Sequence, residues 1–437
     1  MGETSVGSYD NSRDYLLQPL NDNEEPTRPE RKWTDRVIGK MEPGSMRGSI
    51  FALISTAIGA GCLTIPLIFK WLGITLGLFM IFMGAFSSYY GLIGIALAAD
   101  KHRNYNYPNL VRTILGKNWG LLMDITIILY VYGTLIGYQI MIGTFVPSIA
   151  RSLSINTSPD ETRIVIMCAS CIFIMIPLGL MKNLSSLRFV AMLSAFTLVY
   201  ITFLLVSEYY FFEEHNNIGE VNYFDINVNV FSGYAFCLYA FTCHTNIAQV
   251  QGELKYSNLR RIKKISFRTI LSIMIPYIFL GLYGYLSALD DTPTLIIMRD
   301  TPADIKNDWA MVISKIFMSI TLIFAVPINI HPCRTTIIKN MLKIETPSTK
   351  LHVSVTLLLL LTSLGIAIVY PAITVLFGFL GGFCCGIIVL ILPALLRCKI
   401  MGYQPNSWQF IIIFGGFFVL FLVGSISSVL SIAGIGG

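Results

Sequence analysis

Charged residues are scarce in this chain of 437 residues. Asp, Glu, Lys and Arg make up 13% of it, whereas an ordinary globular protein carries about 25%. Hydrophobic residues account for 54%, and a soluble monomer of this composition would expose more apolar surface than soluble proteins tolerate. The composition therefore argues against a soluble enzyme, a nucleic-acid-binding protein and a disordered chain. It predicts a membrane protein that contacts lipid and no nucleic acid.

The chain also lacks the residue patterns of metal and nucleophilic chemistry. Its five histidines, at positions 102, 215, 244, 331 and 352, have no spacing typical of metal ligands. No Ser-His-Asp arrangement emerges either. We therefore predict that the protein is not an enzyme, and that it uses no metal and no cofactor beyond a coupling ion such as Na⁺ or H⁺.

Long hydrophobic runs, in contrast, are abundant. A helix crosses the hydrocarbon core with about 20 apolar residues, and the runs lack the alternation of a membrane β-barrel. The sequence predicts an all-α polytopic membrane protein with eleven transmembrane helices. The eleven runs lie near 47–69, 74–98, 121–145, 163–180, 189–211, 230–250, 268–289, 309–330, 351–370, 372–395 and 408–430.

The polar segments divide the chain and orient it in the membrane. Residues 1–46 have too little apolar surface to fold alone, so we predict a cytoplasmic tail there, a transmembrane domain at 47–430 and a short tail at 431–437. With the N-terminus inside, 25 Lys and Arg fall in inner segments and five in outer ones, in agreement with the positive-inside rule. None of the nine cysteines lies in an outer loop, which excludes an outer disulfide. The plasma membrane, a vacuolar or lysosomal membrane and the mitochondrial inner membrane are all compatible with this pattern.

Two of the predicted helices are interrupted at corresponding places. The first run has two glycines near its middle, and the sixth has a polar stretch near its own midpoint. They open two successive groups of five helices, so the second group is inverted relative to the first, and such paired interruptions indicate a transporter's binding site. Close helix packing at the glycines and a packing role for the histidine are the alternative interpretations. The predicted substrate-binding residues are Ile58, Gly59, Ala60, Gly61, Cys62, Thr242, Cys243, His244, Thr245 and Asn246.

Few charged residues fall inside the predicted spans. Asp124, Glu208 and Lys315 are the exceptions, and each lies close enough to a helix end to reach the interface by snorkelling. The middle of the membrane is left to backbone and hydroxyl groups. Such a site suits a zwitterion better than a highly charged substrate.

Three separated motifs give the chain a family resemblance. FTCHTNIAQVQGELK at 241–255 resembles the sixth span of the amino acid/auxin permease family, within which the sodium-coupled neutral amino acid transporters are closest. FALISTAIGAGCL at 51–63 resembles the family's first span, and VPINIHPCRTT at 326–336 resembles the end of its eighth. The resemblance implies the eleven-helix, five-plus-five inverted-repeat fold with broken first and sixth helices, and transport of amino acids.

The chain departs from its sodium-coupled relatives at positions that contribute to their cation site. Ser55 stands where those relatives typically have Asn, and Ile323 and Ala325 stand where they have Thr. Ser55, together with Ser319 and Thr321 a turn away, remains as a tentative set of cation ligands. The sequence leaves sodium and proton coupling open.

These observations predict a secondary active transporter of small neutral amino acids that works by alternating access and symport with a cation. A different class of function remains as the alternative: a transporter fold kept as a structural or sensing subunit of a larger membrane complex. In either case the polar N-terminal tail is the segment expected to contact protein partners.

Overall fold

The computed structural model describes residues 44–153, 159–181, 188–215, 220–300 and 308–434. Residues Pro43–Gly437 form one compact unit. The predicted cytoplasmic tail at 1–46 lies almost entirely outside the described residues, and so does the end of the predicted tail at 431–437. The described part of the chain is built from helices and contains no strand, as expected when every backbone polar group must be satisfied inside lipid.

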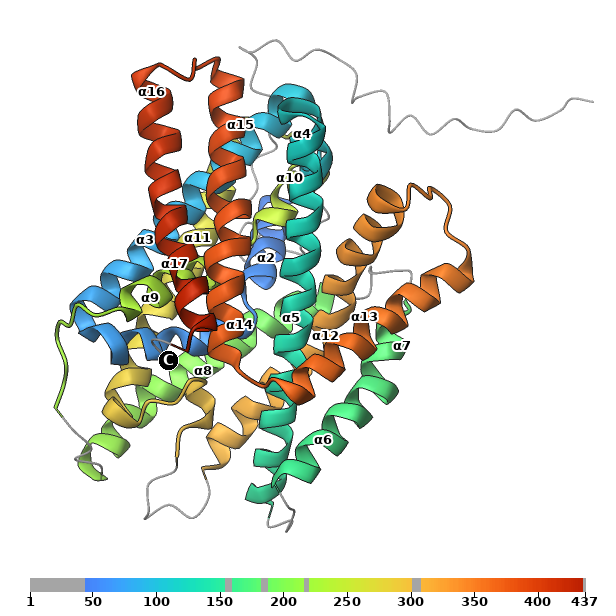
Figure 1. The fold of residues 1–437 in the computed structure, drawn as a ribbon. Coiled ribbons are helices and arrows are strands. Elements are labelled where there is room, and N and C mark those ends of the chain that lie inside the picture. The colour runs from blue at the N-terminus through green and yellow to red at the C-terminus, as the bar shows by residue number, and fades with distance from the viewer. Residues whose placement is uncertain (1–43, 154–158, 182–187, 216–219, 301–307, 435–437) are drawn as a thin grey trace, which may run out of the picture. The chain divides into compact units, whose positions relative to one another are not determined.

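The first half of the described chain, up to the segment before the sixth predicted span, contains the following elements (Figure 1). They are α2 (Met46–Ala57), the 3₁₀ turn η2 (Ala60–Thr64), α3 (Ile65–His102), α4 (Tyr107–Leu115), α5 (Lys117–Ser152), α6 (Pro159–Ser170), the π-helical η3 (Cys171–Met175), α7 (Ile176–Gly179) and α8 (Arg188–His215).

The second half begins with the two short helices of the sixth predicted span. It contains α9 (Asn229–Ala240), α10 (His244–Glu253), α11 (Leu259–Leu286), the 3₁₀ turns η5 (Leu289–Asp291) and η6 (Ile296–Met298), α12 (Trp309–Thr335), the π-helical η7 (Thr336–Met341), α13 (Thr349–Val369), α14 (Ile373–Phe379), the π-helical η8 (Leu380–Ile391), α15 (Leu392–Met401), α16 (Trp408–Phe410), the π-helical η9 (Ile411–Gly415) and α17 (Gly416–Ile432).

Nine helical segments among the described residues are long and apolar enough to cross a membrane. The difference from eleven has two local causes. One segment, Ala60–His102, contains the end of the first predicted span and all of the second, and the sixth span is divided into the two short helices α9 and α10, neither of which is long enough to cross a membrane alone. The count of eleven crossings stays a prediction. The break predicted at Tyr370-Pro371 is present, because α13 ends at Val369 and α14 begins at Ile373.

A glycine marks a turn inside α3, between the first and second predicted spans. Gly73 has φ +77°, a left-handed value that favours glycine. The extended segment 222–225 lies against it: Ile74 N–H donates to Asn222 O over 3.1 Å, and Asp225 N–H donates to Leu72 O over 2.9 Å. A Cβ on Gly73 would lie 2.5 Å from Phe224 N, so this backbone pairing itself requires glycine.

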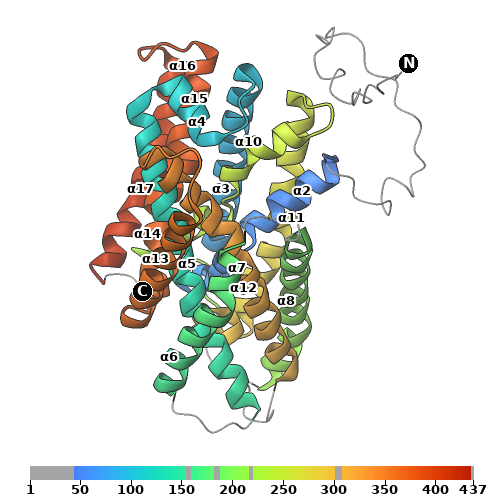
Figure 2. The same cartoon turned by 90° about the vertical axis from the view of Figure 1, so that its right-hand side faces the viewer.

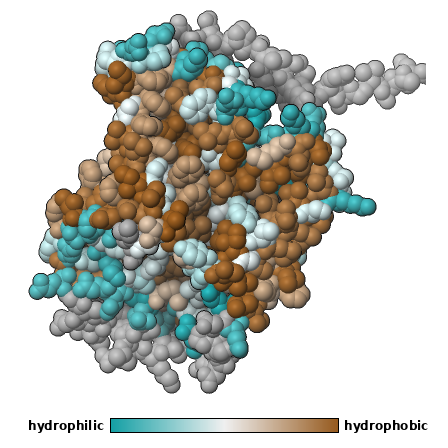
Figure 3. Space-filling view, in the orientation of Figure 1, coloured by the Kyte–Doolittle hydropathy of each residue, from teal (hydrophilic) through white to brown (hydrophobic). Residues whose placement is uncertain are grey.

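The helices pack around two long central members (Figures 1 and 2). The first, α3, packs against α9, α11 and α15, while the second, α5, packs against α6, α12 and α13. The view in Figure 3 shows a broad hydrophobic band between two more hydrophilic ends, which is the surface expected of a protein that spans lipid. We call the end that carries α4, η7 and the α15–α16 connection the basic end, because Lys101, Arg112, Lys339 and Lys399 lie there.

The charged residues inside the predicted spans have hydrogen-bonding partners within the protein, and the prediction that they reach the membrane interface stays a prediction. Asp124 is 1% exposed and accepts hydrogen bonds from Arg112 and from Asn340 Nδ2, the latter over 2.7 Å. Glu208 accepts from Arg299 over 2.7 Å. Lys315 Nζ donates to Ser148 Oγ over 2.9 Å. Partners from distant segments satisfy these charges, as buried charges require.

Candidate functional site

The first helix break leaves backbone amides free of side-chain caps. Helix α2 ends at Ala57, Ile58 is extended, and Gly59 (φ −150°, ψ −151°) precedes η2 without a side-chain cap. The first N–H groups of a helix have no partner within it, and they attract anions. The carbonyls behave differently, because Cys62 Sγ donates to Gly59 O over 3.1 Å and Thr64 Oγ1 donates to Gly61 O over 2.9 Å. This break therefore offers donors rather than acceptors.

The second break, between α9 and α10, is held by side chains of neighbouring helices. Ser88 Oγ, from α3, donates to Phe241 O over 2.9 Å, and Tyr277 OH, from α11, donates to Ala240 O over 3.1 Å. His244 is fully buried, and its Nε2 lies 3.0 Å from Ser88 O. The last carbonyls of α9 are thus already satisfied, as buried backbone groups need to be.

A cavity of about 380 Å³ connects the two breaks. Four helical regions form most of its wall: α2 with η2, the middle of α5, the two halves of the broken helix α9–α10, and the second half of α12. The segment 105–109 at the start of α4, the π-helical η7 and Ser194 of α8 complete it. Its lining residues include no Asp or Glu. The ionisable side chains in its wall are five tyrosines, His331 and Lys339.

Hydrogen bonds between helices cross the cavity wall. Asn246 Nδ2 of α10 donates to Thr56 Oγ1 of α2 over 2.9 Å, which connects the two helix breaks directly. Asn329 Nδ2 of α12 donates to Tyr138 OH of α5 over 3.3 Å. The amides and hydroxyls therefore form a polar surface that can exchange its internal hydrogen bonds for bonds to a polar solute.

Aromatic rings form the part of the wall next to the first break. The ring of Tyr239 stacks on Phe377 with centroids 4.8 Å apart and meets the edge of Tyr130 at 6.0 Å. A Cβ on Gly61 would lie 2.7 Å from Tyr239 Cδ1. The absence of a side chain at Gly61 is thus what lets this ring lie against the unwound backbone.

The cavity reaches the surface at the basic end. Asn109 at the start of α4 and Lys339 in η7 are exposed and line it there. Asp124 of α5 accepts hydrogen bonds from Arg112 of α4 and from Asn340 of η7, and so connects the two elements that flank this opening. The structure thus describes a state whose cavity is open at the basic end.

The structure brings six of the thirteen predicted site residues to the cavity. The six are Ser55, Gly59, Ala60, Gly61, Thr245 and Asn246. The other seven do not line it, and they are Ile58, Cys62, Thr242, Cys243, His244, Ser319 and Thr321.

Several residues of the second set have other partners. Thr242 Oγ1 donates to Leu238 O over 2.5 Å, and Ser319 Oγ donates to Lys315 O over 2.7 Å. Thr321 Oγ1 lies 3.1 Å from Thr197 Oγ1 of α8. The three tentative cation ligands are thus not brought together, because Ser55 alone among them lines the cavity.

Sequence reasoning missed the contribution of α5 to the cavity. Tyr130, Thr134 and Tyr138 line it, and they are four residues apart, so they form one stripe along a helix. A polar stripe within an otherwise apolar span was a usable signal. On α12, Asn329 and His331 were missed as well. His331 lies within the motif at 326–336 that carries part of the family resemblance.

A helical membrane protein with a polar cavity at two helix breaks has the architecture of a solute transporter. A solved manganese transporter from Eremococcus coleocola has the same fold, with a TM-score of 0.57 at 12% identity over 96% of this chain and 91% of that one. The sequence profile described as "Transmembrane amino acid transporter protein" matches residues 42–435. The chain belongs to this family, the amino acid/auxin permeases, and is a multi-pass membrane protein.

Named relatives support the assignment. A candidate amino acid transporter of Plasmodium falciparum, AAT1, is 27% identical over 71% of this chain, which spans about half the length of that relative. Vacuolar amino acid transporter 5 of Schizosaccharomyces pombe is 26% identical over 79% of this chain and 82% of its own length. Sodium-coupled neutral amino acid transporter 7 of Danio rerio is 23% identical over 85% and 83%. The family and these relatives are transporters rather than enzymes.

Proposed function

We propose that the protein is a secondary active transporter of small neutral amino acids that works by alternating access. The observation that carries this proposal is the cavity, which joins both helix breaks and has no carboxylate among its lining residues. A neutral amino acid is a zwitterion, whose two charges can be met by amides, carbonyls and hydroxyls without a buried counter-charge.

The amides at the start of η2 are the proposed carboxylate site. They belong to Gly59, Ala60 and Gly61, all of which line the cavity, and the positive end of a helix favours an anion. The amino group would then face oxygens on the other side of the cavity, where Thr245 and Asn246 lie. The aromatic wall formed by Tyr130 and Tyr239 limits the size of the side chain that fits.

We further propose that eleven helices cross the membrane as two inverted groups of five and one additional helix. The positions of the breaks support this, since α2–η2 and α9–α10 lie in the first and sixth predicted spans. The predicted cytoplasmic N-terminus would make the basic end cytoplasmic, and the cavity would then face the cytoplasm. Relatives named as vacuolar transporters favour a vacuolar or lysosomal membrane over the plasma membrane.

We propose cation coupling, and the geometry favours a proton over sodium. Ser319 and Thr321 do not line the cavity, so Ser55 is the one tentative sodium ligand that faces it. His331 does line it. A substrate carboxylate close to this imidazole would favour its protonated form, so proton and substrate would each promote binding of the other.

Uptake by the purified full chain in proteoliposomes tests this function. A panel of labelled neutral, acidic and basic amino acids is offered, with sodium and pH gradients imposed separately. We expect exchange of small neutral amino acids, accumulation with a pH gradient, and no gain from sodium. Absence of exchange for every member, together with stoichiometric co-purification with a large complex, would instead identify the structural or sensing subunit.

A further inference from the structure

The end of the molecule opposite the basic end is closed over the first helix break by a short loop. The turn η6 (Ile296–Met298) contacts η2, and Ile296 and Ile297 are fully buried. Gly284 in α11 makes room for this packing, since a Cβ there would lie 2.6 Å from Pro66 Cγ and 3.2 Å from Ile296 Cγ1. The loop therefore inserts apolar side chains between the unwound backbone and the surface at this end.

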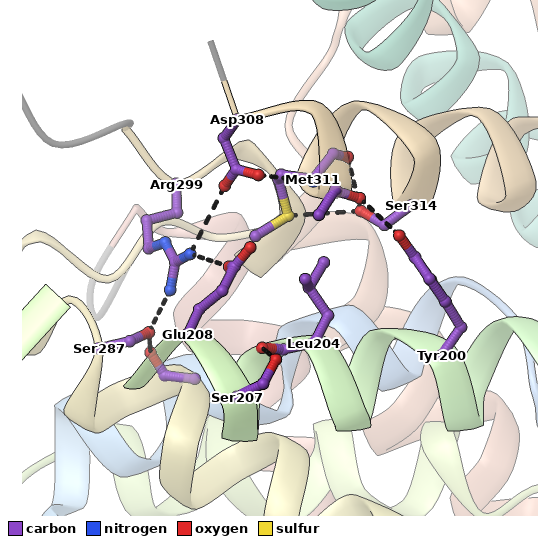
Figure 4. A network of polar contacts seen from close by, with 11 residues as sticks. Tyr200, Leu204, Ser207, Glu208, Ser287, Arg299, Asp308, Met311 and Ser314 are labelled. Atoms are coloured by element: carbon purple, nitrogen blue, oxygen red, sulfur yellow. Dashed lines mark hydrogen bonds and ion pairs between the residues drawn. The ribbon is translucent and has the colours of Figure 1, made fainter. Parts of the chain in front are cut away.

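Arg299 follows the buried loop directly and fixes it to three neighbouring segments (Figure 4). Its guanidinium donates to Glu208 Oε2 of α8 over 2.7 Å and to Ser287 Oγ at the end of α11 over 2.6 Å. Asp308 Oδ2, at the N-terminus of α12, lies 4.0 Å away. The Arg299 side chain is 4% exposed, so removal of one partner would leave a buried charge uncompensated, which costs more than the loss of a surface ion pair.

The network joins helices that belong to different parts of the bundle. Helix α11 packs against α3, which follows the first break directly, whereas α12 packs against α5. Helix α8 packs against both α11 and α12. A change in the angle between the α3–α11 pair and the α5–α12 pair would therefore pull on the contacts of Arg299.

We propose that the segment 295–299 is the gate at this end and that the ion pair between Arg299 and Glu208 is its latch. This inference rests on the proposed alternating access, in which the side that is closed here must open in turn. With the latch formed, η6 covers η2, and the cavity opens only at the basic end. Release of Arg299 from Glu208 lets η6 withdraw and exposes the first break from the opposite end.

The latch differs from the Asp124 contacts at the basic end. The Arg299 contacts stabilise the closed end of the molecule, whereas Asp124 connects α4 and η7 at the end where the cavity is open. Weakening the latch should therefore shift the population toward the state that is open at the latch end, by the free energy that the latch contributes to the closed state.

Cys62 provides a native reporter of this opening. It lies in η2 beneath the loop, and it is 1% exposed. The full chain is reconstituted in liposomes of defined orientation and treated from the latch end with a membrane-impermeant thiol reagent, and peptide mass spectrometry assigns the label to Cys62. In Glu208→Gln we expect Cys62 to react about tenfold faster than in wild type, because a charge-assisted bond is lost.

Two further variants grade the latch. Asp308→Asn should give a smaller acceleration, since Asp308 lies farther from the guanidinium and Asn still accepts the bond from Met311 N–H that begins α12. Ser207→Ala is the matched control next to Glu208. Its hydroxyl donates to Leu204 O within α8, so the Cys62 labelling rate should equal that of wild type.

The experiment separates the gate from the proposed function. Folded Glu208→Gln protein that labels at the wild-type rate from the latch end overturns the gate, even when wild type transports amino acids. Faster labelling in a protein that transports nothing supports the gate and overturns the proposed function. Equal acceleration in Ser207→Ala would also overturn the latch, because the effect would then not depend on the ion pair.

Discussion

The two helix breaks differ in how their exposed backbone polar groups are satisfied. At the first, the unwound backbone of η2 starts without a side-chain cap, lines the cavity, and fits against the Tyr239 ring only because residue 61 is glycine. At the second, Ser88, Tyr277 and His244 satisfy or hold the backbone, and Tyr239, Thr245 and Asn246 on either side of the junction line the cavity. Under the proposed function, the break whose amides lack side-chain caps binds the substrate carboxylate, whereas the break whose carbonyls are satisfied holds the helix junction in place.

The largest expected effect is at the first break. In Gly61→Val the new side chain would meet Tyr239 Cδ1 at 2.7 Å and Ala240 Cα at 3.2 Å, and the second contact is backbone that cannot rotate away. We expect uptake to fall by about 100-fold, as for other displacements of about 1 Å near a site. Gly59→Ala is the matched control, because its Cβ would make an ordinary 3.4 Å contact with Tyr138 OH. Equal uptake by both variants would contradict the site assignment.

At the second break the same logic predicts a loss of stability rather than of binding. Ser88→Ala removes the donor to Phe241 O, which leaves a buried carbonyl unsatisfied at a cost of about 2 kcal/mol. Thermal unfolding of purified protein should show this loss, while substrate affinity per folded molecule stays near that of wild type. Thr362→Ala on the exposed face of α13 controls for loss of a hydroxyl. A large drop in affinity with unchanged stability would show that the second break binds substrate.

A smaller effect is expected where the two breaks meet. Asn246→Ala removes the bond to Thr56 Oγ1 and a polar group of the cavity wall. We expect the KM for a neutral amino acid to rise by about tenfold, the usual loss for one good hydrogen bond in a buried site. Thr56→Val is the complementary variant: it keeps the size of the Thr56 side chain but removes the hydroxyl that accepts the bond from Asn246. A normal KM in Asn246→Ala would place the substrate elsewhere in the cavity.

The smallest effect on uptake is expected for a substitution on α5, because this helix is not part of either break. Tyr138→Phe removes the acceptor of the 3.3 Å bond from Asn329 and leaves the ring in place, so uptake should fall about threefold. Asn329 keeps its second bond, to Ala325 O over 3.0 Å. A loss as large as that of Gly61→Val would mean that α5, rather than the first break, dominates binding.

Much of the architecture could be predicted from the sequence, because the signals are local. The glycines at 59 and 61 disfavour helix where they stand, and the polar stretch at 242–246 interrupts an apolar run. Which groups face the cavity was not predictable in this way. His244 is held by Ser88, which is 156 residues away, and Thr321 is paired with Thr197 on another helix. A sequence shows that a residue is polar, but its partners depend on how distant helices pack.

The partners of the buried charges could not be predicted for the same reason. Asp124 lies near the end of its predicted span, where snorkelling is expected. Its hydrogen bonds from Arg112 and Asn340 depend on how α4 and η7 pack against α5. Tyr130, Thr134 and Tyr138, in contrast, share one helix and one face, and their spacing alone could have identified the third wall of the cavity.

Helix α3 connects the two breaks physically. It starts directly after η2, and its residue Ser88 holds the junction of α9 and α10. The segment 222–225 braces its turn at Gly73 through backbone bonds. The unwound backbone of one break and the anchor of the other therefore lie on the two helical parts that meet at Gly73, and α3 also packs along α11 and α9. Under the proposed alternating access, the braced turn at Gly73 is the point through which a movement at one break would be transmitted to the other.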